Sequence, residues 1–344
     1  MLIKDLAAQC AADVQGGGAE REVTSAADIM SAQAHQATVL SDAKYKKYLL
    51  ETQAAACFIS DKLLSETAPP PDLALLVCAD PEMAFLQAVK LLHPEPDYPR
   101  SISPHAALEA DVQLGEDVHI GPFASIGAGS RIGDGVTIDA GARIGRGVVI
   151  GKHSRIYANA VIYDACVLGN EVLIHAGAVI GADGFGYKFR DNQHVKVPHV
   201  GHVEIADRVE IGANTCIDRG ALGATRIGAG SKIDNLVQLG HNNVVGRNVI
   251  ICGQSGISGS CNIGDGAILA GSSGLADHVN IGARATVMAR SGISADVPAG
   301  AQVFGSPAKD RKIAWRELAA LAKLPDLLQR FKELENRLRR LEGE

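Results

Sequence analysis

The sequence predicts a mainly β protein, most of which is a parallel β-helix built on a six-residue repeat. An aliphatic residue occupies every sixth position over residues 102–180 without exception. The same register returns over 205–217 and again over 227–293. A period of six fits neither an α-helix nor a flat strand, whereas it fits the hexapeptide β-helix, in which three short strands close each coil. The segments on either side lack the repeat and carry helical and strand patterns instead.

We expect three regions: an α/β domain over residues 1–100, the β-helix over 101–307 and a helical extension over 308–344. In the first region, residues 44–51 have a helical pattern and residues 55–59 have the pattern of a buried strand. An apolar strand over 73–78 and a helix over 81–92 form a second pair, with Pro81 in the first turn of the helix. This alternation of strands and helices is typical of a small α/β domain.

The repeat is interrupted twice. The longer insertion covers residues 182–204, and the shorter one lies near residues 219–223. A long insertion between coils must project from the β-helix, and projecting loops often form ligand sites. We therefore expect functional residues near these interruptions.

The helical extension carries an apolar seam. Pro325 is expected to separate two helical segments. In the second segment, apolar residues alternate spacings of four and three: Leu327, Phe331, Leu334, Leu338 and Leu341. This pattern fits a short coiled coil, and it fits a single amphipathic helix packed on the β-helix equally well. Residues 309–344 also contain ten Lys or Arg against seven Asp or Glu, so this basic surface suits an acidic partner unless it is only a solvated helix face.

Composition argues against several classes of protein. A formal net charge of -6 argues against a protein that binds nucleic acid. No segment approaches the ~20 apolar residues of a membrane span, and the N-terminal residues do not have the pattern of a signal peptide. The seven cysteines are scattered without a C-x-x-C spacing, which favours reduced thiols. We therefore expect a cytoplasmic protein without a membrane span.

Histidine is the side chain best suited to accept a proton near neutral pH, and its position singles out His241. It lies between Gln238 and Asn242, whose amides could hold a sugar or an amide carbonyl. One coil is eighteen residues long, which leads from His241 to Gly259, where a backbone N–H without a side chain suits an oxyanion hole. His278 lies two coils and one residue beyond His241, and we expect it at the same groove. For His241 and for His278, the alternative is a solvated side chain on the surface of the β-helix.

Three stretches of the sequence carry a resemblance to a known family. They are Gly181–Gly186 in the longer insertion, Ile211–Leu222, and Asp234–Asn242. In these stretches, and over nearly the whole chain, the sequence resembles the UDP-3-O-(3-hydroxyacyl)glucosamine N-acyltransferases of lipid A biosynthesis. The resemblance implies an N-terminal uridine-binding domain, a left-handed β-helix and C-terminal helices.

The resemblance also implies an activity. A (3R)-hydroxyacyl group would move from acyl carrier protein to the 2-amine of a UDP-linked, 3-O-acylated glucosamine. His241 matches the general base, the N–H of Gly259 would hold the oxyanion, and His278 matches a second histidine of substrate binding and catalysis. No cofactor or metal is implied, because the acyl group arrives on the phosphopantetheine arm of the carrier protein. The family implies a homotrimer with active sites between subunits.

The N-terminal domain departs from the family pattern. The uracil-binding stretch of the family commonly reads aromatic-x-x-Asn-x-x-Tyr, and the matching residues here are Val39, Asp42 and Tyr45. Tyr45 can stack on a uracil ring, whereas Val39 cannot. An ionised Asp42 accepts hydrogen bonds but does not donate them. We therefore predict Tyr45 as a nucleotide contact and Asp42 as the residue at the adjacent contact position.

Three other functions fit parts of the sequence. An O-acyltransferase acting on UDP-N-acetylglucosamine would have the same repeat and a histidine base. The expected N-terminal α/β domain disfavours this alternative, because members of that family begin their β-helix almost at the N-terminus. A metal-dependent hydratase would use His194, His199 and His202, which lie in the insertion rather than on adjacent coils. A non-enzymatic β-helical scaffold explains the repeat but neither the insertions nor the N-terminal domain.

Overall fold

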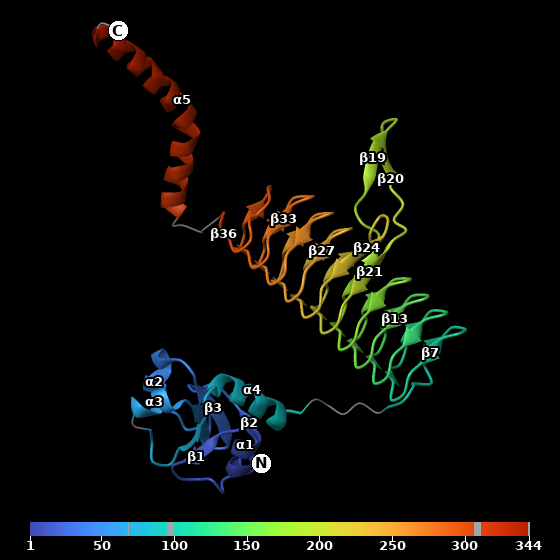
Figure 1. The fold of residues 1–344 in the computed structure, drawn as a ribbon, viewed down its shortest axis with the longest axis vertical. Coiled ribbons are helices and arrows are strands. Elements are labelled where there is room, and N and C mark those ends of the chain that lie inside the picture. The colour runs from blue at the N-terminus through green and yellow to red at the C-terminus, as the bar shows by residue number, and fades with distance from the viewer. Residues whose placement is uncertain (68, 95–99, 306–310, 343–344) are drawn as a thin grey trace. The chain divides into compact units, whose positions relative to one another are not determined.

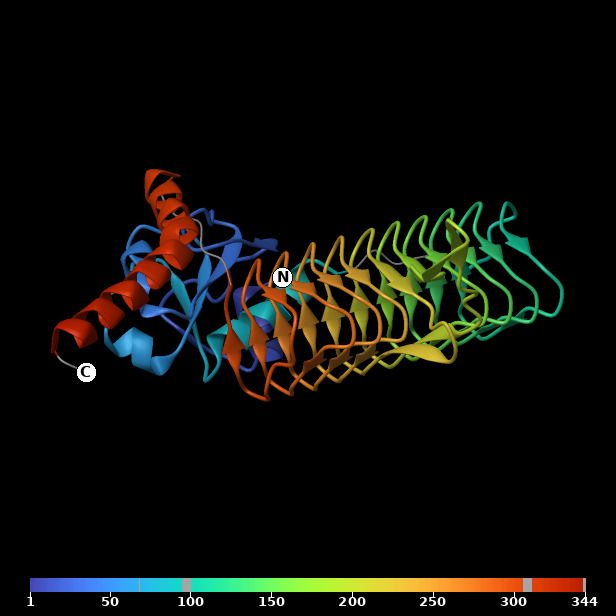
Figure 2. The ribbon, with the colours of Figure 1, turned by 90° about the horizontal axis from the view of Figure 1, so that it is seen from above.

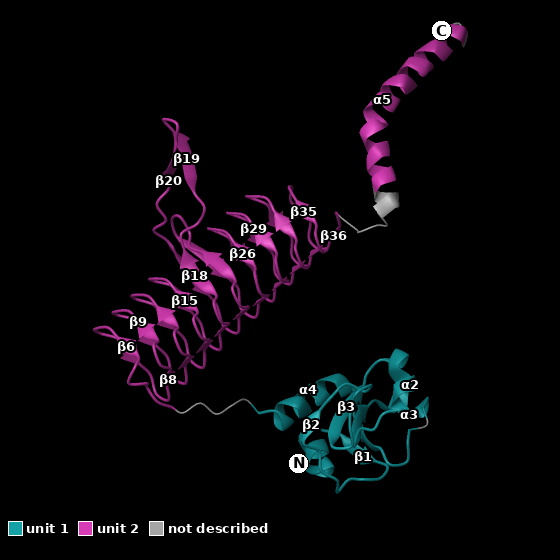
Figure 3. Ribbon diagram, turned by 180° about the vertical axis from the view of Figure 1, so that it is seen from behind, with its two compact units in different colours: residues 1–98 teal, residues 99–344 magenta. Residues whose placement is uncertain are grey.

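A computed structural model describes residues 1–67, 69–94, 100–305 and 311–342 (Figure 1). The chain divides into two compact units, Met1–Tyr98 and Pro99–Glu344, which are coloured separately in Figure 3 and described separately below. The boundary expected after residue 100 falls close to this division. The expected start of the helical extension at residue 308 lies outside the described residues.

The first unit is a five-stranded sheet with helices on both faces. Its strand order is β1-β5-β4-β3-β2, and only β1 runs antiparallel to its neighbour. The strands are β1 (Asp13–Gln15), β2 (Ser25–Ala26), β3 (Gln36–Leu40), β4 (Ala56–Ile59) and β5 (Ala74–Val77). The helices are α1 (Ile3–Gln9), the 3-10 helix η1 (Ala43–Tyr45), α2 (Lys46–Leu49), α3 (Asp61–Ser65) and α4 (Pro81–Leu92).

Side chains of the central strands alternate between two cores. On β4, Phe58 packs with residues of α1 and α4, whereas Ile59 packs with Leu49 of α2 and Leu63 of α3. Both faces of β4 and β5 are therefore buried, as expected for a parallel sheet between helix layers. The α/β domain predicted from the sequence is confirmed, including the helix that begins at Pro81 with Asp80 as its N-cap.

The second unit contains a left-handed parallel β-helix with three flat faces (Figure 2). The first face has nine strands: β7 (Gln113–Leu114), β10 (Arg131–Ile132), β13 (Val149–Ile150), β16 (Val167–Leu168), β21 (His202–Ile205), β24 (Ala224–Ile227), β27 (Val244–Val245), β30 (Asn262–Ile263) and β33 (Asn280–Ile281). Consecutive strands on a face lie one coil apart and pair in parallel, for example Arg131 with Val149.

The other two faces have ten strands each. The second face consists of β8 (His119–Ile120), β11 (Thr137–Ile138), β14 (Arg155–Ile156), β17 (Leu173–Ile174), β22 (Glu210–Ile211), β25 (Lys232–Ile233), β28 (Ile250–Ile251), β31 (Ile268–Leu269), β34 (Thr286–Val287) and β36 (Gln302–Val303). The third face consists of β6 (Ala107–Leu108), β9 (Ser125–Ile126), β12 (Arg143–Ile144), β15 (Val161–Ile162), β18 (Val179–Ala182), β23 (Cys216–Asp218), β26 (Gln238–Leu239), β29 (Gly256–Ile257), β32 (Gly274–Leu275) and β35 (Gly292–Ile293). The register is irregular between β18 and β23, where the longer insertion begins.

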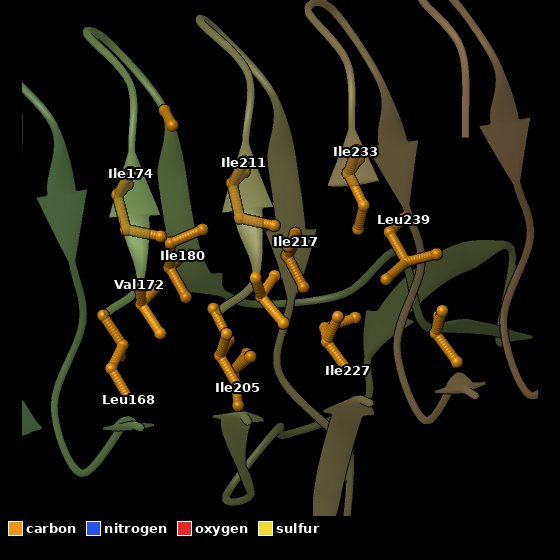
Figure 4. Packing of buried hydrophobic residues seen from close by; sticks show 14 of the residues in the cluster. Leu168, Val172, Ile174, Ile180, Ile205, Ile211, Ile217, Ile227, Ile233 and Leu239 are labelled. Atoms are coloured by element: carbon orange, nitrogen blue, oxygen red, sulfur yellow. The ribbon is translucent and has the colours of Figure 1, made fainter. Parts of the chain in front are cut away.

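The six-residue repeat fills the interior of the β-helix. Away from the ends of the β-helix, the second residue of a two-residue strand, such as Ile174 or Ile211, points inward and is buried (Figure 4). A second buried position follows four residues later and takes small side chains such as Ala142, Val148 and Ser154. Ser154 is tolerated there because its hydroxyl donates to the carbonyl of Gly169 and accepts the N–H of Val172. This narrow, branched core explains why only 4% of the residues are aromatic.

Two backbone positions in each hexad close the corners. The residue directly after the inward one lies so close to the next coil that a Cβ on Gly133 would be 2.9 Å from the Lys152 nitrogen. Two residues later the backbone is left-handed, with φ of 65° at Gly135 and 59° at Asn159. The functional candidates Asn242 and His278 occupy this second kind of position, with φ of 58° and 60°. Their side chains are therefore fixed to corners of the coils.

The two insertions lie at the same level of the β-helix. The longer one contains the hairpin β19 (Tyr187–Arg190) and β20 (Gln193–Lys196), which projects from the coils in Figure 1. Its returning segment binds the shorter insertion, because Val200 donates to the carbonyl of Ala221 and Gly201 to that of Gly220. The expected projecting loop is thus a hairpin whose base is tied to the neighbouring turn.

The C-terminal region differs from the sequence prediction. Instead of two segments separated by Pro325, a single helix α5 (Arg311–Glu342) runs through the proline. Proline removes one N–H donor and crowds the carbonyl four residues earlier, and α5 is visibly bent in Figure 1. The proline is accommodated within one helix because the residues on both sides of it favour helix. The described side chains of α5, including its apolar seam, are exposed.

Candidate active site

A groove of about 1360 Å³ lies on the third face of the β-helix, beside the base of the longer insertion. One wall comes from Asp183–Phe185, Tyr187 and Lys196 of the insertion. The other wall is the outer surface of successive coils, from Gln238 through Gly259 to Ser294. The groove is thus assembled where the regular repeat meets its main interruption.

His241 lies at this groove and is held by its neighbour. Its Nδ1 is 3.0 Å from Oδ1 of Asn242, which also accepts the N–H of Ala221 at 2.9 Å. The amide nitrogen of Asn242 donates to the carbonyl of Leu222 at 3.1 Å, which fixes the orientation of the amide. Because Oδ1 can only accept, Nδ1 of His241 carries the proton and Nε2 keeps its lone pair. The ring of His241 is thereby held in one orientation by an amide and not by a carboxylate.

Gly259 lies directly opposite the ring of His241, as the eighteen-residue coil predicts. A Cβ on Gly259 would be 2.7 Å from Nε2 of His241, so the ring occupies the space that any side chain would need. The N–H of Gly259 makes no hydrogen bond within the described part of the chain. The ring of His241 and the backbone of Gly259 therefore meet at the groove.

His278 and Gln238 also line the groove. The backbone N–H of His278 donates to the carbonyl of Gly259. The coil corner that carries His278 is thus hydrogen-bonded to the residue predicted to hold the oxyanion. Its exposed ring makes no hydrogen bond with the described residues. Gln238 precedes the inward Leu239 on β26 and bonds to the carboxylate of Asp218. The structure thus brings together His241, Gly259, His278 and Gln238.

The other predicted contacts lie elsewhere. Asn242 is not among the groove-lining residues, because its amide is used to hold His241 and the shorter insertion. Tyr45 and Asp42 belong to the first unit. Tyr45 is 39% exposed, which leaves its ring accessible, and the Lys44 ammonium lies 4.8 Å from the ring centroid. Asp42 caps η1 by accepting the N–H of Lys44, and hydrogen bonding to the Lys44 side chain lowers the pKa of this carboxyl.

Of the three aspartates that line the groove, Asp183, Asp218 and Asp277, two have contrasting environments. Asp218, at the end of β23, is only 8% exposed, and this burial raises its pKa against the opposing effects of the Gln238 hydrogen bond, His241 and His199. Asp183 is exposed and pairs with Lys196, which lowers its pKa. One carboxylate is therefore held in a less polar setting close to the histidines, and the other is an ordinary ion-paired group.

Several residues of the groove were missed by the sequence analysis. A column of glycines, Gly256, Gly274 and Gly292, forms the outward positions of β29, β32 and β35. Their eighteen-residue spacing is the signal that could have revealed them. Asp218 had no such signal, because the insertions break the register, and the contact that His199 makes with His241 behind the groove could not be predicted because it depends on the folded loop.

The histidines considered for a metal are separated. His194 contacts Phe189 on the hairpin, His199 packs against His241, and His202 bonds to Glu204 on the first face. Within residues 1–67, 69–94, 100–305 and 311–342, no group of three or more His, Cys, Asp or Glu is placed to hold a metal ion. The arrangement gives no support to a hydratase that uses these three residues.

Comparison with known proteins identifies relatives of this chain. Residues 20–91 match the family model for UDP-3-O-(3-hydroxymyristoyl) glucosamine N-acyltransferase, LpxD, and residues 111–146 and 147–182 match the bacterial transferase hexapeptide repeat. A UDP-3-O-acylglucosamine N-acyltransferase of Methylobacterium sp. (strain 4-46) is 42% identical over 308 residues, covering 88% of this chain and 87% of its own. One from Methylacidiphilum infernorum is 46% identical, covering 76% of this chain and 73% of its own.

The fold has a counterpart of known structure. An Arabidopsis UDP-N-acetylglucosamine acyltransferase superposes with a TM-score of 0.54 at 22% identity, covering 60% of this chain and 71% of its own. At this identity the likeness concerns the fold alone.

Fold and groove together define a hexapeptide-repeat acyltransferase. More specifically, the chain belongs to the family of UDP-3-O-acylglucosamine N-acyltransferases. This membership favours N-acylation over the O-acyltransferase and scaffold alternatives. In the part of the chain that the structure describes, no helix is long and apolar enough to cross a membrane.

Proposed function

We propose that this chain transfers a (3R)-hydroxyacyl group from acyl carrier protein to the 2-amine of UDP-3-O-(3-hydroxyacyl)-glucosamine, as a step of lipid A biosynthesis. The observation that carries the proposal is the pairing of the His241 lone pair with the free N–H of Gly259 at the groove. Family membership supplies the class of substrate, and this pairing supplies the chemistry.

The reaction uses His241 as general base. The amine nitrogen attacks the thioester carbonyl carbon and forms the C–N bond, while Nε2 of His241 takes one proton from that nitrogen. The oxygen becomes an oxyanion that accepts the N–H of Gly259. When the tetrahedral species collapses, the C–S bond breaks, and the imidazolium returns its proton to the thiolate. His241 is neutral again, and the products are the amide and the carrier thiol.

The glycine column provides a path for a linear chain. A Cβ on Gly256, Gly274 or Gly292 would meet no atom within 4 Å, so the outer surface of these coils is a smooth trough. The partly exposed Ile293 lines the same trough and gives it an apolar contact. We assign this trough to the acyl chain or the phosphopantetheine arm. The exposed ring of His278 at its edge is placed to contact that arm.

The remaining expectations stay predictions. Tyr45 is the proposed stacking partner of uracil, and its exposed ring supports that role. Asp42 is the N-cap of η1. We therefore expect it to act on nucleotide binding indirectly, by ordering this turn. A homotrimer is supported by the exposed apolar seam of α5, which a coiled coil would cover. A cytoplasmic location remains a prediction.

The decisive experiment offers a set of (3R)-hydroxyacyl carrier proteins and the UDP-amino sugar to wild type and to His241→Ala. Loss of a general base lowers kcat by about 10²–10⁴-fold, and we expect this loss with little change in melting temperature. His153→Ala is the control, because His153 lies at a coil corner one position further along its hexad than His241 and away from the groove. N-acylation by His241→Ala at the wild-type rate would overturn the assignment.

A further inference from the structure

His199 lies behind His241 rather than at the groove surface. It is 7% exposed, and its ring centroid is 5.3 Å from that of His241 with the planes 70° apart. The approach depends on Gly184, since a Cβ there would lie 2.8 Å from Nε2 of His199 and 2.7 Å from Cβ of His241. The loop is thus built around an imidazole pair.

The two nitrogens of His199 have different surroundings. Nδ1 is 2.9 Å from the carbonyl of Val197, which can only accept, so Nδ1 carries a proton. Nε2 is buried and has no hydrogen-bond partner among the described residues. A second proton on Nε2 would create a buried donor without an acceptor, which is costly. The ring therefore keeps a lone pair in the space that it shares with Gly184 and His241.

The groove beside this pair carries other charged and titratable groups. Within the described residues they come from the end of β23, the insertion and the later coils: Asp218, Asp183, Tyr187, Lys196, Asp277 and His278. Asp218 is the buried member, and both histidines act on its carboxylate. When His241 becomes an imidazolium during transfer, its positive charge thus has Asp218 and the His199 lone pair nearby.

We propose that His199 is a positioning residue for acyl transfer, which holds the ring of His241 at the groove and favours its protonated form by presenting an unpartnered ring nitrogen. The inference rests on the proposed function, because it requires that His241 Nε2 take the amine proton and return it to the thiolate. His199 itself touches neither substrate, because Gly184 and His241 lie between it and the groove.

The test compares His199→Phe and His199→Gln with wild type in the carrier-protein assay, over a range of pH. Phenylalanine keeps an aromatic ring but removes the lone pair. We expect kcat to fall about tenfold, KM for the UDP-amino sugar to stay within about twofold, and the acidic limb of kcat/KM to move to lower pH, because the imidazolium is less stabilised. Glutamine retains an acceptor and should recover part of kcat.

The matched control is His194→Phe, which makes the same change on the same insertion at an exposed ring that does not contact His241. It should leave both kcat and the pH profile unchanged. A kcat loss in His199→Phe with an unmoved acidic limb, or a rise of KM alone, would overturn the inference. Full activity of His241→Ala in the same assay would instead overturn the proposed function, so the two failures are distinguishable.

Discussion

At the scale of single residues, the groove contains a carboxylate that is unfavourable for folding. Asp218 is buried, and burial raises its pKa, which means that its charged form is less stable in the folded chain than in water. A side chain of this kind is retained at functional sites when its charge serves the reaction. Its position beside His241 and His199 fits a role in stabilising the imidazolium that the proposed mechanism requires.

We predict that Asp218→Asn is more stable than wild type at pH 7 and less active. A carboxyl with a raised folded-state pKa contributes stability that is present at low pH and lost as the pH rises through that pKa. The asparagine variant should therefore gain of the order of 1 kcal/mol in unfolding free energy at pH 7, as replacements at functional sites commonly do. This gain should vanish near and below the ordinary aspartate pKa of about 3.9.

Urea unfolding at several pH values measures this difference. Asp183→Asn is the control, and its change in unfolding free energy should have the opposite sign, because the ion pair with Lys196 lowers the pKa of Asp183. That exposed pair contributes at most about 1 kcal/mol above the unfolded-state pKa, and the contribution is lost as the pH falls. A destabilised Asp218→Asn at pH 7 would contradict the role described for this carboxylate.

The sequence revealed some of these residues and not others, for a physical reason. The eighteen-residue coil predicts that His241 and Gly259 are neighbours, because parallel stacking fixes their separation. The place of Asn242 was not predicted, since its amide is used by backbone groups of the shorter insertion. His199 reaches His241 only through the path of an insertion that has no periodic register. Periodicity therefore predicts contacts along the coils but not contacts made by inserted loops.

At the scale of elements, the glycine column is a groove formed by three identical strand positions. Each strand presents one outward residue, and three successive glycines leave that row without side chains. Gln238 continues the same row one coil earlier, where the groove meets His241. The row therefore runs from the proposed base along the axis of the β-helix.

We predict that Gly274→Val changes the acyl-chain preference. Gly274 has no left-handed φ, and the position that a Cβ would take there is open, so valine should be accommodated without loss of the fold. Its side chain would fill the trough, and discrimination of about 10–200-fold is typical when a methylene no longer fits an apolar pocket. We expect kcat/KM to fall by about tenfold for the longest hydroxyacyl carrier proteins and to change little for the shortest.

A series of hydroxyacyl carrier proteins of increasing length measures this preference. Gln302→Val serves as the control, because it places valine at an exposed strand position outside the groove. Equal losses at every chain length would show that the trough does not hold the acyl chain. Unchanged rates at every length would lead to the same conclusion.

At the scale of the whole molecule, the residues proposed for nucleotide recognition, chemistry and assembly belong to separate elements. The candidate uracil contact Tyr45 lies in the α/β unit, the proposed base His241 in the β-helix, and the apolar seam in α5. The α/β unit and the β-helix were predictable, because both depend on local periodicity. The continuity of α5 through Pro325 was not, because the cost of an internal proline must be weighed against the helix propensity around it.

We predict that the basic end of α5 contributes to docking of the acidic carrier protein. Arg337, Arg339 and Arg340 lie close together on the last turns, and their side chains are exposed. Replacing all three by Glu should raise the KM for hydroxyacyl carrier protein by about tenfold at low salt, because charge pairs across such an interface mainly speed association. Added salt should shrink the difference, and kcat at saturation should remain within about twofold.

The control must change the net charge by the same amount without changing α5. The triple change of Arg131, Arg247 and Arg284 to Glu does so on exposed positions of the β-helix. If both triple variants raise KM equally, the effect comes from the overall field and not from the helix. If neither does, the basic residues of α5 are only a solvated face. A salt-sensitive effect confined to α5 would separate carrier docking from the chemistry at His241, since reversal of charge on the helix leaves the groove intact.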